Sequence, residues 1–576
     1  MQIIMKVLKH IFAILLLNVF VSCSDFLERP PLDRIRIDDY WKTARDLESY
    51  IFQFYPGFPG HGTGNVNGYG YPVDDSDEVI LGSPSEYLNG VRGITPGRWI
   101  ADWREIRSIN IFFDNYRKCR DDFASYRHFL GEAYFFRAWF YFKLLQKYGD
   151  IPWISSELNI GSEELTQPRT SRTAVVDSML ADLGNATAFL NLRRSVGNSR
   201  LNKEAALAFK ARIALYEGTW QKYHAGTVYG TEGADYRKYL QVCVDAAEEL
   251  INGSDYIRGI YNTGQPTADY YQLFGMENMS GINEILFYRA YNATDGLRNN
   301  VQTLTTNLTG GRGLTWELVS SYLGKDGNPY DYLGMTGSFK GNEYLDKLAE
   351  DIDPRLHATV WMTGDLRWGS PEFYFDKPSL DQVGIGLNPT GFQLKKCSNP
   401  YASGSNAAGG NSETGYILFR YGEVLLNYAE ARYELDGQIA QQELDLLRAR
   451  AGMPEFKVVP RLSDPNPIDY GYELSDALYE IRRERRVELA LEGHRTDDLK
   501  RWAAHHVFKN KRPKGYPFDR TEFPTYNPPL DENGLIDYFQ RLLPNGYQFR
   551  ENRDYLDPIP IEELTLNPAL KQNPGW

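Results

Sequence analysis

Long amphipathic segments joined by loops constrain the fold of this chain more than any other feature of its sequence. Apolar residues recur at helical spacing in six early segments, which lie at 39–55, 101–118, 125–148, 172–192, 203–218 and 236–252. The segment 203–218 is rich in alanine, whose small side chain lets two helix backbones approach closely. The pattern predicts a mainly α fold in which helical hairpins stack in tandem.

Two kinds of segment differ from this amphipathic pattern. Residues 133–142 are apolar almost all round, which predicts a helix buried between other helices. Between 253 and 415, glycine, asparagine and proline become frequent, and helical periodicity remains only near 315–323 and 343–350. Residues 57–98 have the same loop-rich character. We expect ligand-binding residues on these loop-rich segments, because the binding residues of a rigid scaffold commonly lie on its loops.

Helical periodicity returns in the C-terminal part, at 416–436, 439–451 and 475–492. The first of these helices carries one polar stripe, formed by Arg420, Glu423, Asn427, Glu430 and Glu434. In 475–492, four glutamates alternate with four arginines, and the spacing places Glu480 near Arg483 and Arg485 near Glu488. This arrangement predicts an ion-pair lattice along the helix in preference to a phosphate-binding site.

The N-terminus has the order of a bacterial export signal. Lys6 and Lys9 precede a short apolar run, and Cys23 follows a small residue where a signal peptide would be cut. The run is too short to span a bilayer. We expect a lipoprotein signal peptide at 1–22, with Cys23 as the lipidated first residue; the alternative is an ordinary signal peptide with an incidental cysteine.

The domain organisation follows from these segments. A lipidated tether is expected at 23–37 and a single domain at 38–576. Within that domain, the N-terminal part and 416–576 would form a helical scaffold, and 253–415 a loop-rich insertion. The other cysteines, Cys119, Cys243 and Cys397, are far apart and form no CxxC pair, so they are interpreted as buried thiols.

Most catalytic and cofactor motifs are absent from the sequence. The eight histidines contain no HExxH pair, and the chain has no phosphate-binding glycine loop and no GxSxG elbow. We therefore expect no enzyme activity, no metal and no cofactor. With 76 acidic residues, chance carboxylate pairs keep a glycoside hydrolase open as an alternative. The formal net charge of -13 disfavours a nucleic-acid partner.

Aromatic and amide side chains in the loops are the positive signal for function. Aromatic residues make up 14% of the chain, and tyrosine outnumbers phenylalanine by 40 to 29. Flat rings can stack on the C–H faces of sugars, while amide and guanidinium groups bind hydroxyls. The predicted glycan contacts are Trp99, Tyr69, Tyr71, Tyr291, Asn292, Arg298 and Trp316. For each ring the alternative is structural packing.

Several motifs together resemble the SusD/RagB family of Bacteroidetes outer-membrane lipoproteins. They are the start Cys23–Glu28, the stretch 131–152, the motif 420–431, the segment 447–452, the run 484–502 and the closing Asn573–Trp576. The resemblance implies tetratricopeptide-like helix pairs that support a variable, loop-rich ligand face. It also implies a non-catalytic, lipid-anchored protein at the outer-membrane surface.

The same resemblance implies a ligand and a partner. Members capture glycans, or in some cases peptides, and sit as a lid on a TonB-dependent SusC-like transporter. The family often has a tryptophan at the position of Trp99, before the helix that contains Ile106 and Asn110, and more often a tyrosine at the position of Trp103. A surface glycosidase, a peptide-binding member and a purely structural partner of the transporter remain as alternatives.

Overall fold

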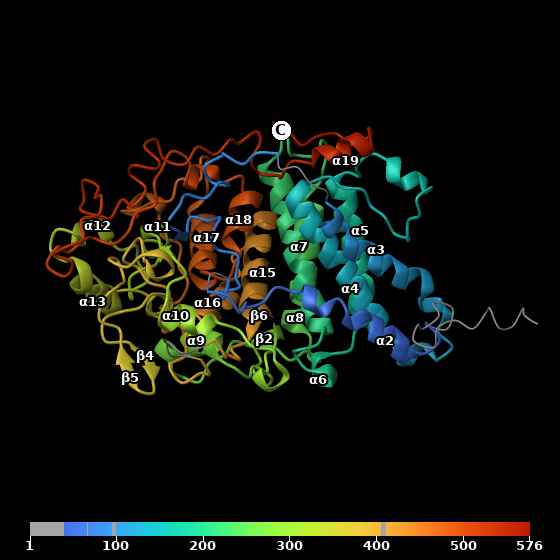
Figure 1. The fold of residues 1–576 in the computed structure, drawn as a ribbon, viewed down its shortest axis with the longest axis horizontal. Helices are drawn as coiled ribbons and strands as arrows, with labels where there is room; N and C mark the ends of the chain where they lie inside the picture. Colours follow the sequence, from blue (N-terminus) through green and yellow to red (C-terminus); the bar gives the residue numbers. More distant parts are fainter. Residues whose placement is uncertain (1–39, 66, 95–98, 405–409) are drawn as a thin grey trace, which may run out of the picture.

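The computed structural model describes residues 40–65, 67–94, 99–404 and 410–576 (Figure 1). The predicted signal peptide at 1–22, the tether at 23–37 and Cys23 lie outside the described residues, so those predictions stay predictions. Within the described part, helices dominate and strands are short. This confirms the predicted mainly α fold.

Paired helices form the scaffold. They are α2 (Ala44–Phe52), α3 (Ile100–Asn115), α4 (Phe123–Tyr148), α5 (Arg172–Phe189), α7 (Lys203–Tyr223), α8 (Tyr236–Asn252), α15 (Tyr421–Asp436), α16 (Gln441–Arg450), α17 (Asp476–Glu488) and α18 (Arg495–Arg501). Neighbours in space follow chain order closely, because α4 packs on α5, α7 on α8, and α15 on both α8 and α17 (Figure 1). The predicted tandem packing of helices is confirmed.

Shorter helices belong mainly to the loop-rich segments. They are α6 (Arg193–Val196), α9 (Pro266–Gly275), α10 (Val301–Thr306), α11 (Trp316–Val319), α12 (Tyr332–Met335), α13 (Gly341–Asp351), α14 (Pro354–Thr359) and α19 (Ile561–Leu566). In Figure 1, α9 to α13 lie toward one end of the molecule, and α2 to α5 lie at the other. Helices α15 to α18 stand between the two ends, whereas α19 lies at the end that holds α3.

Two scaffold helices show how the sequence produces the packing. The middle of α4 is buried all round, with Phe135, Phe136 and Tyr141 inaccessible to solvent, as its apolar pattern predicted. The alanines of α7 are buried as well. At Gly218 a β-carbon would lie 2.8 Å from Leu240 Cδ2 of α8. Small residues on α7 therefore allow the close contact with α8.

Three short antiparallel strand pairs connect the loops to the scaffold. They are β1 (Val79–Ile80) with β3 (Gly313–Leu314), β2 (Ile285–Arg289) with β6 (Tyr416–Arg420), and β4 (Leu366–Gly369) with β5 (Glu372–Tyr374). The prediction of a helix from residue 416 is wrong at its start, because 416–420 form β6 and the helix begins at Tyr421. The sequence Tyr-Ile-Leu-Phe is aromatic and apolar without helical spacing, and it pairs with β2 as a fully buried strand.

The polar stripe of α15 faces the protein interior. Glu423, Asn427 and Glu430 are all buried there. On α17 the predicted pair of Arg483 with Glu480 is present at 3.2 Å. Arg485 instead donates to Asp498 and Asn427, both at 2.8 Å, so most ion pairs of this helix join it to other elements.

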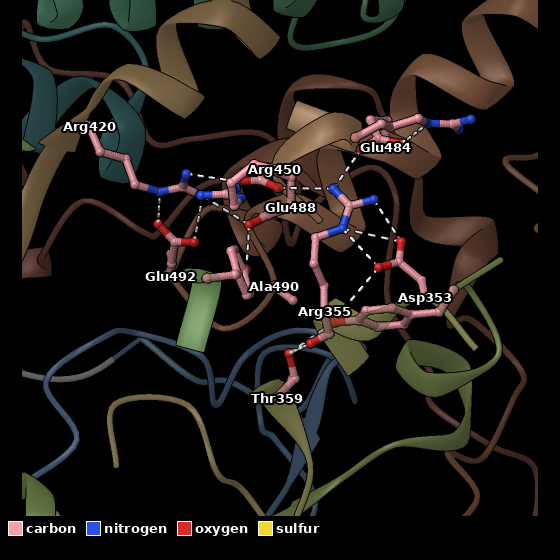
Figure 2. A network of polar contacts seen from close by, with 12 residues as sticks. Asp353, Arg355, Thr359, Arg420, Arg450, Glu484, Glu488, Ala490 and Glu492 are labelled. Carbon is pink, nitrogen blue, oxygen red and sulfur yellow. Dashed lines mark hydrogen bonds and ion pairs between the residues drawn. The ribbon is translucent and has the colours of Figure 1, made fainter. Parts of the chain in front are cut away.

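A buried network of opposite charges, here called the charge lattice, connects the insertion to the C-terminal helices (Figure 2). Its five cations are Arg355, Lys396, Arg420, Arg448 and Arg450, and its five anions are Glu284, Asp353, Glu484, Glu488 and Glu492. Arg420 contacts Glu492 at 2.7 Å and Glu488 at 2.8 Å. The lattice is neutral as a whole, and each member has an oppositely charged partner.

The three cysteines described by the structure are free thiols. Cys243 and Cys397 are buried, as predicted, whereas Cys119 is partly exposed. Burial raises the pKa of Cys397 to about 12, so this thiol stays protonated at neutral pH.

Candidate functional site

A pocket of about 660 Å³, here called the Trp99 pocket, opens between α3, the segment 152–166 and α19. Trp99 caps the N-terminus of α3 and Trp103 follows one turn later, with ring centroids 5.5 Å apart at an interplanar angle of 68°. Ile106 and Asn110 continue the same lining along α3. The volume lies within the range of small-molecule sites, about 300–1,000 Å³.

Two polar atoms of residues lining this pocket have no hydrogen-bond partner within the described structure. Asn110 donates through Nδ2 to the carbonyls of Ile154 and Ser156, at 2.9 and 3.2 Å, which leaves its Oδ1 unpartnered. Trp103 Nε1 is likewise unpartnered. The two residues are seven positions apart and so lie on one helix face. A buried donor and a buried acceptor left unpaired cost free energy, which a bound hydroxyl or water could recover.

Apolar side chains surround the mouth of the pocket. Ile160 is fully exposed, at 102% relative accessibility, and Leu165 and Leu566 are also exposed. Arg107 holds the rim in place by donating to the Leu158 carbonyl at 2.5 Å. Apolar surface that faces water around a concave site commonly marks a binding surface.

The structure separates the predicted contact residues into different neighbourhoods. Trp99 is 8% exposed and packs edge-on against Tyr148, with ring centroids 5.3 Å apart. Trp316 is buried between Tyr332 and Tyr344. In Figure 1, α3 and α19 lie at one end of the molecule, and α11 lies toward the other.

Tyr69 and Tyr71 lie in the core of the protein. They are 3% and 5% exposed, so neither presents a ring face to a ligand in this conformation. The Tyr69 hydroxyl donates to the Leu491 carbonyl at 2.9 Å. Tyr71 stacks on Tyr416, with centroids 4.3 Å apart. Here the alternative of structural packing describes the observed contacts.

Tyr291, Asn292 and Arg298 come together in a surface loop after β2. The Tyr291 hydroxyl donates to the His61 carbonyl at 2.9 Å, so its half-buried ring lies against the loop 57–98. The side chain of Asn292 accepts from the Thr294 amide. Arg298 is exposed and donates to Asn411 Oδ1 at 2.6 Å.

Sequence reasoning found Trp99 but missed most of the residues that complete its pocket. Trp103 and Asn110 entered only as positions of the family pattern, although their spacing from Trp99 on one helix face was an available signal. Leu566 and Leu570 line the pocket from a segment more than 450 residues away. Nothing local in the sequence links that segment to α3.

A second cavity, of about 160 Å³, lies between α4, α7, β6, the turn at 492–494 and the start of α18. We call it the central cavity. Burial alone would raise the pKa of Glu423 on its wall, but the guanidinium of Arg212 holds that pKa at about 2. Burial, reinforced by the charge of Asp498, raises the pKa of Asp497. Burial lowers the pKa of His494 to about 4, so this imidazole is neutral at pH 7.

Two further features of the described residues bear on the kind of site present. No helix in this part of the chain combines the length and apolar composition needed to cross a membrane. The same residues contain no group of three or more histidine, cysteine, aspartate or glutamate side chains arranged to hold a metal ion.

Comparison with protein families matches nearly the whole chain after the N-terminal segment. A family model described as SusD family matches residues 216–576, and one described as "Starch-binding associating with outer membrane" matches 86–215. SusD-like protein P2 of Formosa agariphila is 26% identical over 585 residues, which cover 99% of this chain and 100% of that protein. SusD-like protein P25 of the same organism is 21% identical and covers 99% and 98%.

Solved structures agree with the fold. A SusD-like protein from Bacteroides fragilis superposes with a TM-score of 0.71 at 22% identity, over 95% of this chain and 100% of that chain. A SusD-like carbohydrate binding protein from the same species also gives 0.71 at 22% identity, over 92% and 100%. A laminarin binding SusD-like protein gives 0.57 at 19% identity, over 93% and 100%. These matches confirm the predicted helical architecture.

Proposed function

Because the chain belongs to the SusD family, we propose that it captures glycans at the cell surface and delivers them to a TonB-dependent SusC-like transporter. Two solved proteins of the same fold, a carbohydrate binding protein and a laminarin binding protein, support a glycan as the ligand. The observation that carries the proposal is the Trp99 pocket, where two indole rings line a concave site beside an unpartnered donor and acceptor.

The pocket has the chemistry that a sugar chain requires. The partly exposed indole ring of Trp103 offers an apolar face for the C–H side of a sugar ring, and the small exposed part of Trp99, 8% of its surface, extends that face. Trp103 Nε1 is a donor and Asn110 Oδ1 an acceptor; both atoms are buried and unpartnered among the described residues, so a small shift of the lining would let them bond a sugar hydroxyl. The apolar rim around Ile160 excludes water from these contacts and so strengthens them.

We propose that the protein binds without cleaving. Three carboxylates line the central cavity: Glu423, Glu492 and Asp497. Glu492 is ion-paired with Arg420 and Lys396, which leaves Glu423 and Asp497 as the candidate pair for glycoside hydrolysis. However, Arg212 donates to both oxygens of Glu423, each at 2.6 Å, so that carboxylate has no free oxygen edge for a nucleophile or a base. A glycosidase therefore remains the weaker alternative.

The test is affinity electrophoresis and calorimetry with a panel of soluble glycans that includes laminarin. We expect Trp99→Ala and Trp103→Ala each to weaken binding by about tenfold, because losing one stacking ring costs on the order of 1 kcal/mol or more. The control is Tyr401→Ala, which removes an exposed ring away from the pocket. Circular dichroism would verify that each variant is folded.

Other outcomes would redirect the proposal. Unchanged affinity in both tryptophan variants, with Tyr291→Ala weakened, would move the site to the surface loop after β2. Shortening of the polymer by the wild-type protein would favour the hydrolase. Retention of a peptide library without any glycan would favour the peptide-binding alternative.

Anchoring and delivery need separate tests. We propose that Cys23 carries the lipid, so Cys23→Ala should release the protein in soluble form and abolish palmitate labelling. A membrane-bound, labelled variant would contradict the anchor.

Gentle detergent extraction of the wild-type protein should recover a much larger outer-membrane transporter in near-stoichiometric amount. Recovery of the lipoprotein alone would contradict the delivery step.

A further inference from the structure

We propose that the central cavity binds a single neutral sugar unit, at a site separate from the Trp99 pocket. The cavity lies between α4, α7, β6, the turn at 492–494 and the start of α18. It is lined by three cationic and three anionic side chains: Lys143, Arg212, Arg420, Glu423, Glu492 and Asp497. The cavity is therefore rich in polar groups but has no net charge.

The partners of these side chains divide them into two classes. Arg420 pairs with Glu492 at 2.7 Å (Figure 2). Arg212 pairs with Glu423, so these four groups form a fixed wall. Asp497 accepts one hydrogen bond, from Gln146 at 2.7 Å. Among the contacts of the described residues, the side chains of Lys143 and His494 have no hydrogen bond or ion pair within the protein.

The three groups outside this wall offer both kinds of hydrogen bond. Lys143 donates only, ionised Asp497 accepts only, and a neutral imidazole at His494 does one of each. A sugar hydroxyl both donates and accepts, so a polyhydroxylated ring can serve all three groups. A charged ligand would pair with the lining side chains of opposite charge and lie close to those of like charge. In a partly desolvated site this costs free energy.

The size of the cavity limits the ligand to one ring. At about 30 Å³ per water molecule, 160 Å³ holds about five waters. Trp139, Phe142 and Tyr416 contribute aromatic surface to the lining, which suits the apolar face of a sugar ring. A chain of several sugars does not fit.

Access to the cavity runs past Lys143. This residue is exposed, and it also lines a groove of about 320 Å³ between α3 and α4, together with Asp102 and Glu105. The opposite wall is closed by Gly493, whose φ is +82° and whose added β-carbon would lie 2.5 Å from Pro72 Cδ. A terminal sugar could enter from the groove, while the rest of its chain stays outside.

The experiment uses the purified chain and ligand-observed NMR. The neutral probes are D-glucose, D-galactose, D-mannose and L-fucose, and the charged comparators are D-glucuronate and D-glucosamine; the choice of sugars as probes rests on the proposed function. We expect at least one neutral probe to bind and both charged comparators to bind at least fivefold more weakly. Asp497→Asn, Lys143→Met and His494→Phe should each weaken the neutral probe at least fivefold, while the exposed Glu473→Gln should leave it unchanged.

Three results would overturn the proposal. They are no binding of any neutral probe at up to a 50-fold excess of probe over protein, preferential binding of a charged comparator, and binding unaffected by Asp497→Asn and Lys143→Met. Lys143 is exposed, so its variant remains informative even if a buried variant fails to fold. If laminarin or another polymer binds through Trp99 while the single sugars fail, only this inference falls. If the single sugars bind and no polymer does, the proposed capture of glycan chains falls instead.

Discussion

The charge lattice and the central cavity share Arg420 and Glu492 and are built from the same kinds of side chain, but they differ in how completely their charged groups are paired. In the lattice, Arg420 contacts Glu284, Glu488 and Glu492, and all four are buried. In the cavity, Lys143 and Asp497 have no ion pair among the described residues. Full pairing indicates a role in holding the fold, whereas unpaired groups beside a cavity are available to a ligand.

The lattice holds together parts of the chain that are distant in sequence. Asp353 and Arg355 come from the insertion, and Glu484 and Glu488 come from α17 (Figure 2). Burial alone would raise the pKa of Glu488, but Arg450, Arg420 and Arg355 hold it well below its ordinary value. This carboxylate is therefore ionised over the whole physiological pH range.

The largest effect should come from breaking the lattice at Glu488→Gln. The variant keeps the shape of the side chain but leaves three arginines short of one negative charge. Breaking a buried ion pair from one side typically costs about 3–5 kcal/mol, so we expect the free energy of unfolding to fall by that amount. Urea denaturation would measure it.

The matched control is Glu473→Gln, the same change at a side chain with 96% relative accessibility. We expect a shift within about 0.5 kcal/mol. If Glu488→Gln lowers the free energy of unfolding by less than about 1 kcal/mol, the lattice is not a major source of stability. The proposed difference between the lattice and the cavity would then be wrong.

The next largest effect is the pH dependence of stability that comes from two buried carboxyl groups outside the lattice and the cavity, Glu78 and Glu317. Burial raises the pKa of Glu78 from 4.5 to about 7, against the pull of Arg486, and burial also raises the pKa of Glu317 to about 7. Because these folded-state values are raised, the stability that each group contributes is present in full below pH 4.5 and is lost as the pH rises through 7. The full change for Glu78 is on the order of 3 kcal/mol.

We therefore expect the wild-type protein to lose stability between pH 5 and pH 8. Glu78→Gln should reduce that loss without abolishing it, because its amide cannot ionise while Glu317 continues to titrate. Thermal unfolding in matched buffers across this range would measure both slopes. An identical slope in the variant would exclude Glu78 as a titrating group.

The sequence predicted local structure better than it predicted partners. The helix limits of α4 and α8 follow from apolar periodicity, which is a local property of the chain. The start of α15 was missed because the strand 416–420 depends on pairing with β2, about 130 residues earlier. The partners of Arg485 were missed for the same reason, since Asp498 and Asn427 come from other elements.

In the candidate site, too, single residues could be predicted from the sequence but their partners in space could not. Trp99 could be predicted from its type and position, but Leu566 joins its pocket only through the fold. Tyr69 and Tyr71 were chosen because they lie in an aromatic loop, yet the loop turns their rings toward Tyr416 and the core. Composition indicates that rings are available for ligand binding, and only the tertiary packing decides which of them face solvent.

The smallest effect should come from Asp497→Asn, the acid-to-amide change of Glu488→Gln applied to the cavity. Asp497 has no ion pair among the described residues, and burial together with the charge of Asp498 raises its pKa. Its ionised form is thus disfavoured by folding, so a neutral amide should raise the free energy of unfolding at pH 7 by on the order of 0.5 kcal/mol.

The pH dependence of this stabilisation by Asp497→Asn shows whether it comes from removing the ionised carboxylate. A raised folded-state pKa means that the wild-type carboxyl contributes stability at low pH and loses it as the pH rises through the folded value. The amide does not titrate, so the advantage of the variant should be near zero below pH 4 and should grow toward neutral pH. Denaturation curves of both proteins at pH 3.5 and pH 7 would measure the difference. If Asp497→Asn lowers the free energy of unfolding at pH 7 by several kcal/mol, Asp497 belongs with the structural charges of the lattice. If it raises that free energy slightly, opposite in sign to the effect of Glu488→Gln, the fold tolerates a destabilising carboxylate here, as expected for a group that binds a ligand.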